Sequence, residues 1–461
     1  MQKLSLWFRD SFPKYLLGAV LIIVPLFPKF PLLAIPGTYV AIRFEDLILF
    51  LLGVTTLIKI LSNTKVFFKD EITVAFLLFF GVNLVSLISG VFLTQTVSLH
   101  IGLLNYFRRV EYIIPFFAIL TLFNKEQIKA NLGYYVKILL LVTSVAFIYG
   151  LGQRYFAFPI IITQNDQYAK GVALRWTEGA HISSTFAGHY DMAAFMVLVL
   201  PIFISLFFIL KEKMSKLWLV LPIVGGLWLL VNSLSRISQV SYLVAVSLPL
   251  LISKKFKALV AVLVVSIVLI GASSSLNARF ARVIEVFYQK IKTETPISLN
   301  INISVKAEET TPQLLKTTQA VPVVTPVPVF EDRSTSIRLK VEWPRAIRAF
   351  KINPLLGTGY SSISMATDND YLRMLGETGL LGFMAFFLIF ARIGKLFIKA
   401  LGKLKDMTEL ERGYVVGIIG GTVGIFISSF FIDLFEASKL AILLWFMLGY
   451  AVYLIRSYTD E

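Results

Sequence analysis

Long apolar runs separated by short polar segments recur along almost the whole chain. Their lengths approach the roughly 20 residues that a helix needs to cross a lipid bilayer. The pattern predicts about twelve membrane-spanning helices, at residues 14–35, 44–61, 72–93, 98–123, 134–156, 189–210, 217–233, 237–253, 258–272, 374–394, 413–432 and 438–455. We therefore expect an all-α polytopic membrane protein. No cleavable leader pattern precedes the first run, so we expect that run to remain as an anchor.

The composition agrees with this pattern. Hydrophobic residues make up 57% of the chain and the mean hydropathy is +0.77, which is more apolar surface than one soluble core of this length can bury. The chain contains no cysteine. Disulfides, thiolate metal ligands and a cysteine nucleophile are therefore excluded.

One long polar segment divides the chain into three parts. Residues 1–272 hold predicted helices one to nine, residues 273–373 form a loop, and residues 374–461 hold helices ten to twelve. Within the loop, residues 293–330 are rich in Pro and Thr, which predicts a flexible, extended insert. Residues 334–350 show the apolar spacing of a helix, which we expect to lie at the membrane surface.

The charge distribution predicts how the protein sits in the membrane. The formal net charge of +16 would also suit a nucleic-acid-binding protein. The lysines and arginines, however, lie beside the predicted helix ends, and most of them fall in loops on one side. The positive-inside rule then predicts that both termini are cytoplasmic and that the 273–373 loop lies outside the inner membrane. We expect membrane lipids, and not nucleic acid, as partners.

The densest polar stretch stands directly against an apolar run. Residues 367–377 include Asp368, Asn369, Tyr371 and Glu377, and a predicted membrane segment follows at once. Ionisable groups at the edge of the hydrocarbon region are costly unless they have partners or a function. This junction is therefore predicted to be part of a functional site.

Further polar clusters are predicted on the same outer side. They contain Arg236 at a hinge between two spans, His181 just before the span at 189–210, and Arg338, Arg345 and Arg348 on the loop helix. Guanidinium groups stay charged and present a fork that fits phosphate oxygens. Several of them beside a lipid-facing site suit the diphosphate head group of a polyprenyl lipid.

Simpler explanations compete at each of these positions. Arg236 can snorkel from a helix end to the interface, and Arg345 with Arg348 can form a solvated helix face. His181 can be a polar residue before a helix. For charges elsewhere, the simpler explanations are internal ion pairing for Arg108, Arg109 and Glu111, and an interfacial position for Asp433 and Glu436.

Three separated stretches resemble the O-antigen ligase and polymerase family of polytopic glycosyltransferases. The first is Ser184-Thr185-Phe186-Ala187-Gly188, and the second is Ser235-Arg236 at the start of a span. The third is an arginine-bearing helix followed by Pro-x-x-Gly-x-Gly at 354–359, by Asp368-Asn369, and by Glu-x-Gly-x-x-Gly at 377–382. Ligases of this family look to have a histidine where this chain has Asp368, and an Asp-Asn pair looks more like the polymerases.

The resemblance implies an inverting, metal-independent glycosyltransferase without a cofactor. Its donor would be an undecaprenyl-pyrophosphate-linked glycan, and its acceptor a glycan, lipid or protein outside the membrane. Arg236 and Arg338 would hold the pyrophosphate, and Asp368 would orient or deprotonate the acceptor. The resemblance assigns substrate binding or positioning to Arg345, Arg348, Asn369, Tyr371, Glu377 and His181.

Other functions stay open at this point. A chain with this many helices also suits a transporter or flippase of a lipid-linked oligosaccharide or a small solute, although its two halves show no internal symmetry. An inactive structural member of the family is a further alternative. The triplet Asp368-Asn369-Asp370 keeps a Mg²⁺ or Ca²⁺ site open, because these ions prefer oxygen ligands.

Overall fold

A computed structural model describes residues 11–35, 41–62, 64–160, 174–273, 336–364 and 366–459, together with Asn277 and Ala281. The predicted insert at 293–330 lies outside the described residues. The elements are α2 (Phe12–Leu26), β1 (Pro31–Ala34), β2 (Ala41–Arg43), α3 (Phe44–Ser62), α4 (Thr64–Phe67), α5 (Glu71–Phe92), α6 (Leu99–Leu122), α7 (Lys125–Tyr155), α9 (His189–Ile209), α10 (Lys213–Asn232), α11 (Arg236–Ile252), α12 (Phe256–Gly271), η1 (Arg338–Glu342), α15 (Trp343–Ile352), α16 (Asp370–Lys403), α17 (Glu409–Ser428) and α18 (Ser438–Thr459).

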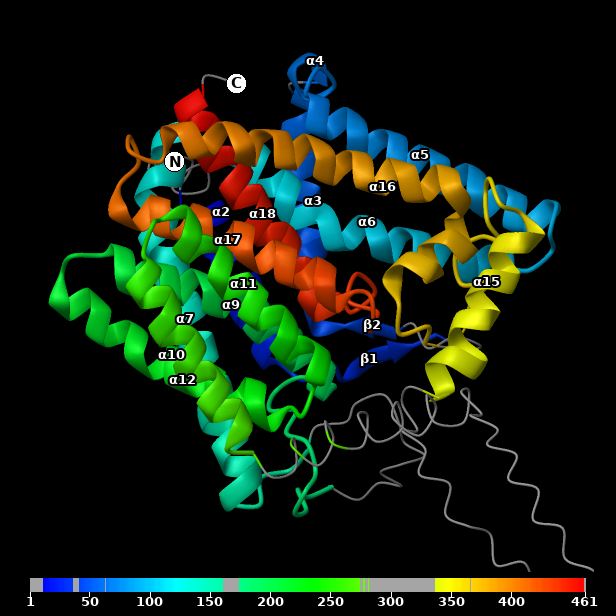
Figure 1. Cartoon of the computed structure of the whole chain (residues 1–461). Helices are drawn as coiled ribbons and strands as arrows, with labels where there is room; N and C mark the ends of the chain where they lie inside the picture. Colours follow the sequence, from blue (N-terminus) through cyan, green and yellow to red (C-terminus); the bar gives the residue numbers. More distant parts are fainter. Residues whose placement is uncertain are drawn as a thin grey trace, which may run out of the picture.

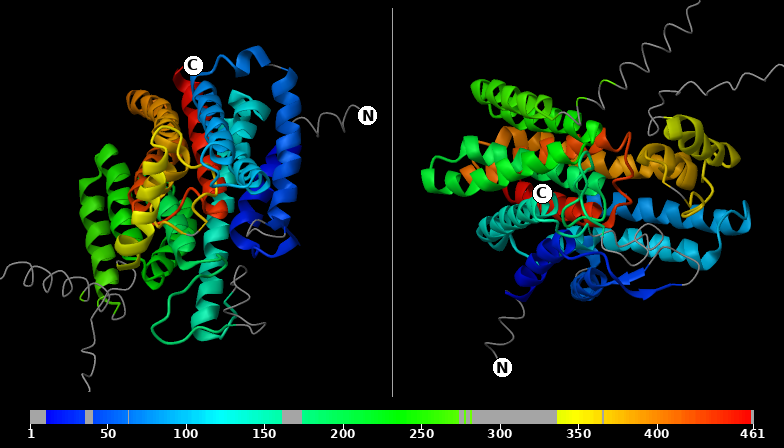
Figure 2. Two further views of the ribbon diagram at one scale, coloured as in Figure 1. Left: turned by 90° about the vertical axis from the view of Figure 1, so that its right-hand side faces the viewer. Right: turned by 90° about the horizontal axis from the view of Figure 1, so that it is seen from below.

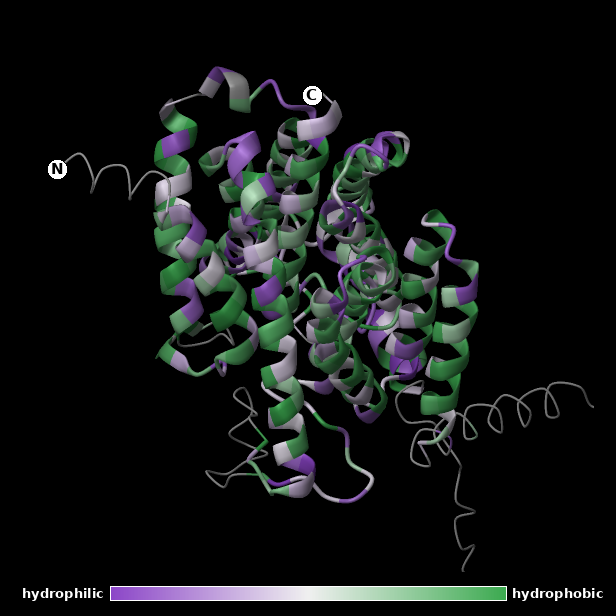
Figure 3. Ribbon diagram, turned by 90° about the vertical axis from the view of Figure 1, so that its left-hand side faces the viewer, coloured by the Kyte–Doolittle hydropathy of each residue, from purple (hydrophilic) through white to green (hydrophobic). Residues whose placement is uncertain are grey.

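Each predicted membrane interval overlaps one of these helices. Seven helices in the described part are long and apolar enough to cross a membrane, namely α5, α7, α9, α10, α16, α17 and α18. Helices α2, α11 and α12 are apolar but shorter. The all-α membrane fold is thus confirmed in outline, whereas the number of twelve spans stays a prediction. In Figure 3 hydrophobic residues occupy many positions along the helices.

The first predicted span is too long. Helix α2 ends at Leu26, and Phe27 is already extended, with φ −76° and ψ 132°. Pro28 follows, and a residue before proline is disfavoured in the helical region, which accounts for the end of the helix. The chain then forms β1, which pairs antiparallel with β2. Because the residues of β1 are also apolar, the hydrophobic run continues past the end of α2, and the predicted span was therefore too long.

Two helices form the centre of the bundle. Nearly every residue of α9 and α18 is buried. Helix α9 packs against α17, α11 and α10, and α18 packs against α6 and α16 (Figure 1). By contrast, Ser266 is the one buried residue of α12, which therefore lies at the edge of the bundle and exposes apolar side chains.

The two ends of the bundle have different characters. At one end, Arg456 near the end of α18 pairs with Asp70, and the Tyr458 hydroxyl donates to Glu411 at 2.8 Å. The start of α2 lies at this end too (Figure 1). At the opposite end lie the hairpin, the starts of α9, α11, α16 and α18, and α15, which Figure 2 shows packed beside α16. Which end faces the cytoplasm stays a prediction.

Candidate active site around Arg338 and Asp368

An arginine–aspartate pair forms the centre of the site. Arg338 begins the π-helical turn η1, and its side chain is 9% exposed. Its Nε and Nη2 both donate to Oδ2 of Asp368, at 3.0 and 2.7 Å. Nη2 also donates to the Tyr190 hydroxyl at 3.4 Å. The loop helix, the Asp-Asn pair and the first turn of α9 therefore meet at one point, as the family resemblance leads one to expect.

A histidine pair adjoins Tyr190. The ring of His189 lies 4.1 Å from that of Tyr190 and 3.8 Å from that of His181, which stacks on it. His181 is thus brought to the same side of the bundle as Arg338. The sequence indicated His181, but it gave no sign that Tyr190 is the residue that contacts Arg338.

The Asp368 loop is clamped from outside its own segment. Asp433, between α17 and α18, accepts the backbone N–H of Thr367 at 2.8 Å and that of Asn369 at 2.9 Å. These residues flank Asp368, which has a left-handed φ of 49°. Such a conformation is uncommon for a residue other than glycine, and it persists where surrounding contacts impose it. Asp433 supplies those contacts, and its position at the membrane interface stays a prediction.

Asn369 and Asp370 fix the start of α16. The Asn369 side chain accepts the N–H of Leu372 at 3.0 Å as an N-cap. The Asp370 carboxylate accepts the N–H groups of Leu434 at 2.7 Å and Phe435 at 3.2 Å. The two carboxylates of the Asp-Asn-Asp triplet therefore point to different partners. Within the described residues, no group of three or more His, Asp or Glu side chains could hold a metal ion.

A buried ion network supports Asp433. Arg373 lies 3.1 Å from Asp433 and 3.5 Å from Glu377, which is 1% exposed. Arg109 on α6 pairs with Glu436 and lies 3.8 Å from Glu377. Buried charges persist where partners surround them. Arg109 therefore has an internal partner, as the simpler explanation expected, and the interfacial position of Glu436 stays a prediction.

The two glycine motifs are one structural unit. The Thr358 N–H donates to Gly376 O at 2.9 Å, and the Leu380 N–H donates to Pro354 O at 2.8 Å. Gly379 breaks the helical conformation of α16 with φ +66°, and a Cβ there would lie 2.3 Å from Leu355 O. A side chain cannot fit at this position. The Pro-x-x-Gly-x-Gly and Glu-x-Gly-x-x-Gly motifs thus lock the loop before Asp368 against α16.

The remaining predicted residues differ in burial and in their local contacts. Arg236 begins α11, is half-buried, and follows the N-cap Ser235, whose side chain accepts the Ser238 N–H. On α15, Arg345 is half-buried and Arg348 is exposed. Tyr371 points toward α17, where its hydroxyl donates to Phe426 O at 2.6 Å. Tyr371 thus packs against α17, and its role in substrate binding stays a prediction.

Burial sets the electrostatics of the site. It raises the pKa of Asp368, with Arg338 opposing and Asp433 adding to the shift. Burial also raises the pKa of Glu342, at the end of η1, to about 7, and the charge of Asp368 acts in the same direction. A carboxylate with a raised pKa is a stronger base once it ionises. Glu342 is a second carboxylate at the site that the sequence analysis did not single out.

These features define an integral membrane protein with a charged, partly buried site at one end of its helical bundle. Residues 221–387 match the family model described as O-Antigen ligase, so the chain carries a domain of the O-antigen ligase family, which confirms the resemblance. The match includes Arg236, Arg338, Asp368 and Glu377. Tyr190 and Asp433 lie outside it. No curated protein matches the chain.

Proposed function

We propose that the protein is an inverting, metal-independent glycosyltransferase that transfers or polymerises glycan from an undecaprenyl-pyrophosphate-linked donor. The reaction takes place on the outer face of the inner membrane, with both termini of the chain in the cytoplasm. The acceptor is a hydroxyl of a glycan, lipid or protein. The family match supports glycan transfer of the O-antigen ligase or polymerase type from a lipid-linked donor.

The observation that carries this proposal is the Arg338–Asp368 contact. Two guanidinium nitrogens of Arg338, Nε and Nη2, donate to Oδ2 of Asp368, and Oδ1 takes no part in this contact. The Asp368 side chain is 25% exposed, so an acceptor hydroxyl can reach it. A cation suited to phosphate and a carboxylate suited to a hydroxyl proton thus stand side by side, as a displacement at a glycosyl phosphate requires.

The proposed chemistry is a single displacement at the anomeric carbon. The acceptor oxygen forms a bond to that carbon while its proton passes to Asp368. The bond from the anomeric carbon to the pyrophosphate oxygen breaks, and the pyrophosphate leaves with the electron pair. Arg338, with Arg236, stabilises the charge that grows on the leaving group, and Arg345 with Arg348 attracts the donor. Asn369 and Glu377 position the Asp368 loop, and His181 binds substrate.

The decisive experiment uses purified protein in proteoliposomes with a lipid-linked glycan donor and acceptor. We expect elongated or transferred glycan and free polyprenyl pyrophosphate, at a rate that EDTA does not change. Asp368→Asn keeps the shape of the side chain but removes the base, so it should bind donor and transfer poorly. Movement of intact donor across the bilayer without any new glycosidic bond would refute transfer and favour a flippase. A rate that requires added Mg²⁺ would refute metal independence.

A further inference from the structure

Tyr190 places a phenolic hydroxyl beside the two central residues of the site. Arg338 Nη2 donates to this hydroxyl at 3.4 Å and to Asp368 Oδ2 at 2.7 Å. A guanidinium nitrogen can only donate, so the hydroxyl oxygen is the acceptor and its own proton points in another direction. Arg338 is the one hydrogen-bond partner of this hydroxyl among the described residues. The O–H proton is therefore available to a ligand.

Stacked rings fix the direction of the Tyr190 side chain. Tyr190 lies in the first turn of α9, a helix in which every residue from Met192 to Leu206 is buried. Its ring lies 4.1 Å from that of His189, and the His189 ring stacks at 3.8 Å on that of His181. The hydroxyl is thus held in one place, so it need not reorganise when charge develops beside it.

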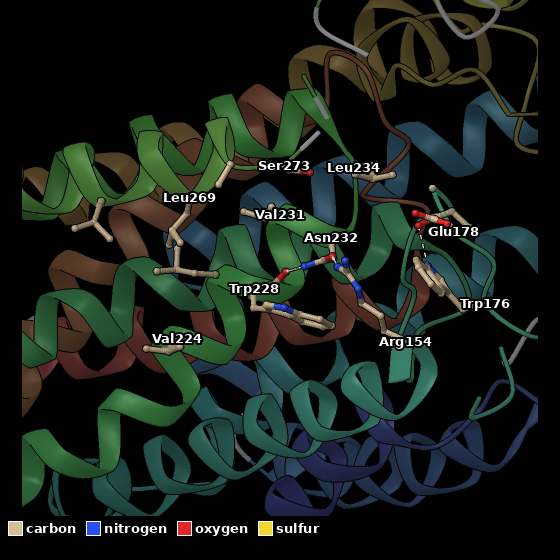
Figure 4. A pocket seen from close by; sticks show the side chains of 15 residues that line it. Arg154, Trp176, Glu178, Val224, Trp228, Val231, Asn232, Leu234, Leu269 and Ser273 are labelled. Carbon is tan, nitrogen blue, oxygen red and sulfur yellow. Dashed lines mark hydrogen bonds between the residues drawn. The ribbon is translucent and has the colours of Figure 1, made fainter. Parts of the chain in front are cut away.

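The segment that carries His181 is anchored to α10. Its next residue, Ile182, donates the backbone N–H to Asn232 O at 3.0 Å. Arg154 of α7 donates in turn from Nη1 to the side-chain oxygen of Asn232, at the wall of a cavity that both residues line (Figure 4). The histidine at the base of the ring stack is therefore tied to two helices.

The stretch directly before α9 is held by side chains of two other helices. Ser184 has a left-handed φ of 53°. The side-chain amide of Gln153, on α7, accepts the Ser184 N–H at 2.9 Å and donates to Ser184 O at 3.1 Å. Lys439 of α18 donates from Nζ to Thr185 O at 2.9 Å. A strained conformation persists where such contacts impose it, so α7 and α18 set the position of the first turn of α9.

We propose that Tyr190 is a further catalytic residue, whose hydroxyl donates a hydrogen bond to the pyrophosphate oxygen that leaves the anomeric carbon. This inference rests on the proposed function. In the intact donor this oxygen bridges carbon and phosphorus and carries little charge. As its bond to carbon breaks, it takes the electron pair, and a fixed donor beside Arg338 stabilises the new negative charge. The proton of Tyr190 stays on the phenol, while that of the acceptor passes to Asp368.

The contact with Arg338 favours the leaving oxygen over a sugar hydroxyl as the partner of Tyr190. A hydroxyl that accepts from a cation is polarised and becomes a stronger donor, and an anion gains most from such a donor. Asp368 and the phenol also accept from the same nitrogen. A base for the acceptor and a donor for the leaving oxygen thus lie within one contact of Arg338.

Tyr190→Phe removes the hydroxyl and keeps the ring in its stack. In proteoliposomes, kcat of glycan transfer should fall about 30-fold, as expected for the loss of a hydrogen bond to a charged group. Donor KM should stay within a few-fold, because the bond strengthens only as the charge develops. Tyr453→Phe removes a hydroxyl that donates to Phe123 O at 2.9 Å, at the other end of the bundle, and should leave kcat unchanged. An unchanged kcat in Tyr190→Phe would overturn the proposal.

A double substitution separates a direct contact from an effect through Arg338. Arg338→Lys keeps a charge but loses the fork. If Tyr190 contacts the leaving group itself, adding Tyr190→Phe to Arg338→Lys should lower kcat at least about tenfold further, since independent effects multiply in rate. If the added substitution changes nothing, Tyr190 acts only by holding Arg338, and the proposed contact is wrong.

Binding of undecaprenyl pyrophosphate tests the same contact without transfer. The terminal phosphate of this lipid carries, as a free charged oxygen, the atom that was bonded to the sugar. It should bind Tyr190→Phe about tenfold more weakly than the unaltered protein or Tyr453→Phe, as followed by the rise in melting temperature with lipid concentration. Equal affinity in Tyr190→Phe would overturn the inference. Binding by an unaltered protein that forms no glycosidic bond would instead refute the proposed function, and the contribution of Tyr190 can still be measured.

Discussion

Asp433 offers the sharpest test of how the site is held together. Asp433→Asn keeps one oxygen but places an NH₂ group against a backbone N–H, so one of the bonds to Thr367 and Asn369, at 2.8 and 2.9 Å, is lost. A hydrogen bond to a charged group contributes about 1.5–3 kcal/mol. If the lost bond costs about 2 kcal/mol of transition-state stabilisation by misplacing Asp368, the rate of transfer falls about 30-fold, because each 1.36 kcal/mol is a factor of ten in rate.

The measurement is kcat and donor KM of glycan transfer in proteoliposomes, with protein amount and melting temperature checked for each variant. Asp433 positions another residue and does not touch the substrate, so kcat should fall while donor KM stays within a few-fold. Asp406→Asn makes the same change at an exposed position near the other end of the bundle and serves as the control. An unaltered kcat in Asp433→Asn would refute the idea that this clamp holds Asp368.

Three further predictions follow from the same contacts. Arg338→Ala should abolish detectable donor binding in a lipid pull-down, and Lys should restore it only in part because it lacks the fork. Gly379→Ala should lower the melting temperature and membrane abundance, because its Cβ would meet Leu355 O at 2.3 Å, whereas Gly394→Ala has open space on the same helix. Glu342→Gln should flatten the pH dependence of the melting temperature, because a carboxyl whose pKa rises to about 7 on folding stabilises the protein at low pH and loses that contribution as the pH rises through 7.

Each of these predictions has a contrary outcome. Full restoration of donor binding by Arg338→Lys would mean that a point charge suffices and that the fork is not used. Equal melting temperatures for Gly379→Ala and Gly394→Ala would show that the motif backbones are not locked together. A melting temperature that rises between pH 5 and pH 8 in the unaltered protein, and not in Glu342→Gln, would reverse the sign of the Glu342 effect.

Local patterns predicted the helices well and long-range partners poorly. A hydrophobic run of fixed length requires a helix in a bilayer, because the backbone groups need internal partners. The same reasoning failed at Pro31–Ala34, where apolar residues form a strand of the hairpin. An apolar run alone does not distinguish a strand from the end of a helix.

The sequence analysis predicted the two central residues of the site but not the residues that hold them in place. Arg338 and Asp368 can be recognised in the sequence, because charged residues beside a membrane segment are energetically costly and usually have a function. Asp433 and Tyr190 lie 65 and 178 residues from Asp368 in the sequence. Their roles depend on which segments pack together, and nothing local encodes this packing. Tyr371 belongs to the same polar stretch, and its ring packs against Phe426 of α17, a contact that the sequence also did not reveal.

The Arg338–Asp368 contact implies a sequence of events for the proposed reaction. While the guanidinium occupies Oδ2, it stabilises the ionised carboxylate and so weakens it as a proton acceptor. When a diphosphate draws the guanidinium away, the carboxylate becomes more basic at the moment when the donor is in place. Asp368 therefore does not deprotonate an acceptor hydroxyl or a water molecule before the donor has bound. The resting ion pair protects a costly lipid-linked intermediate from hydrolysis and makes donor binding the obligatory first step.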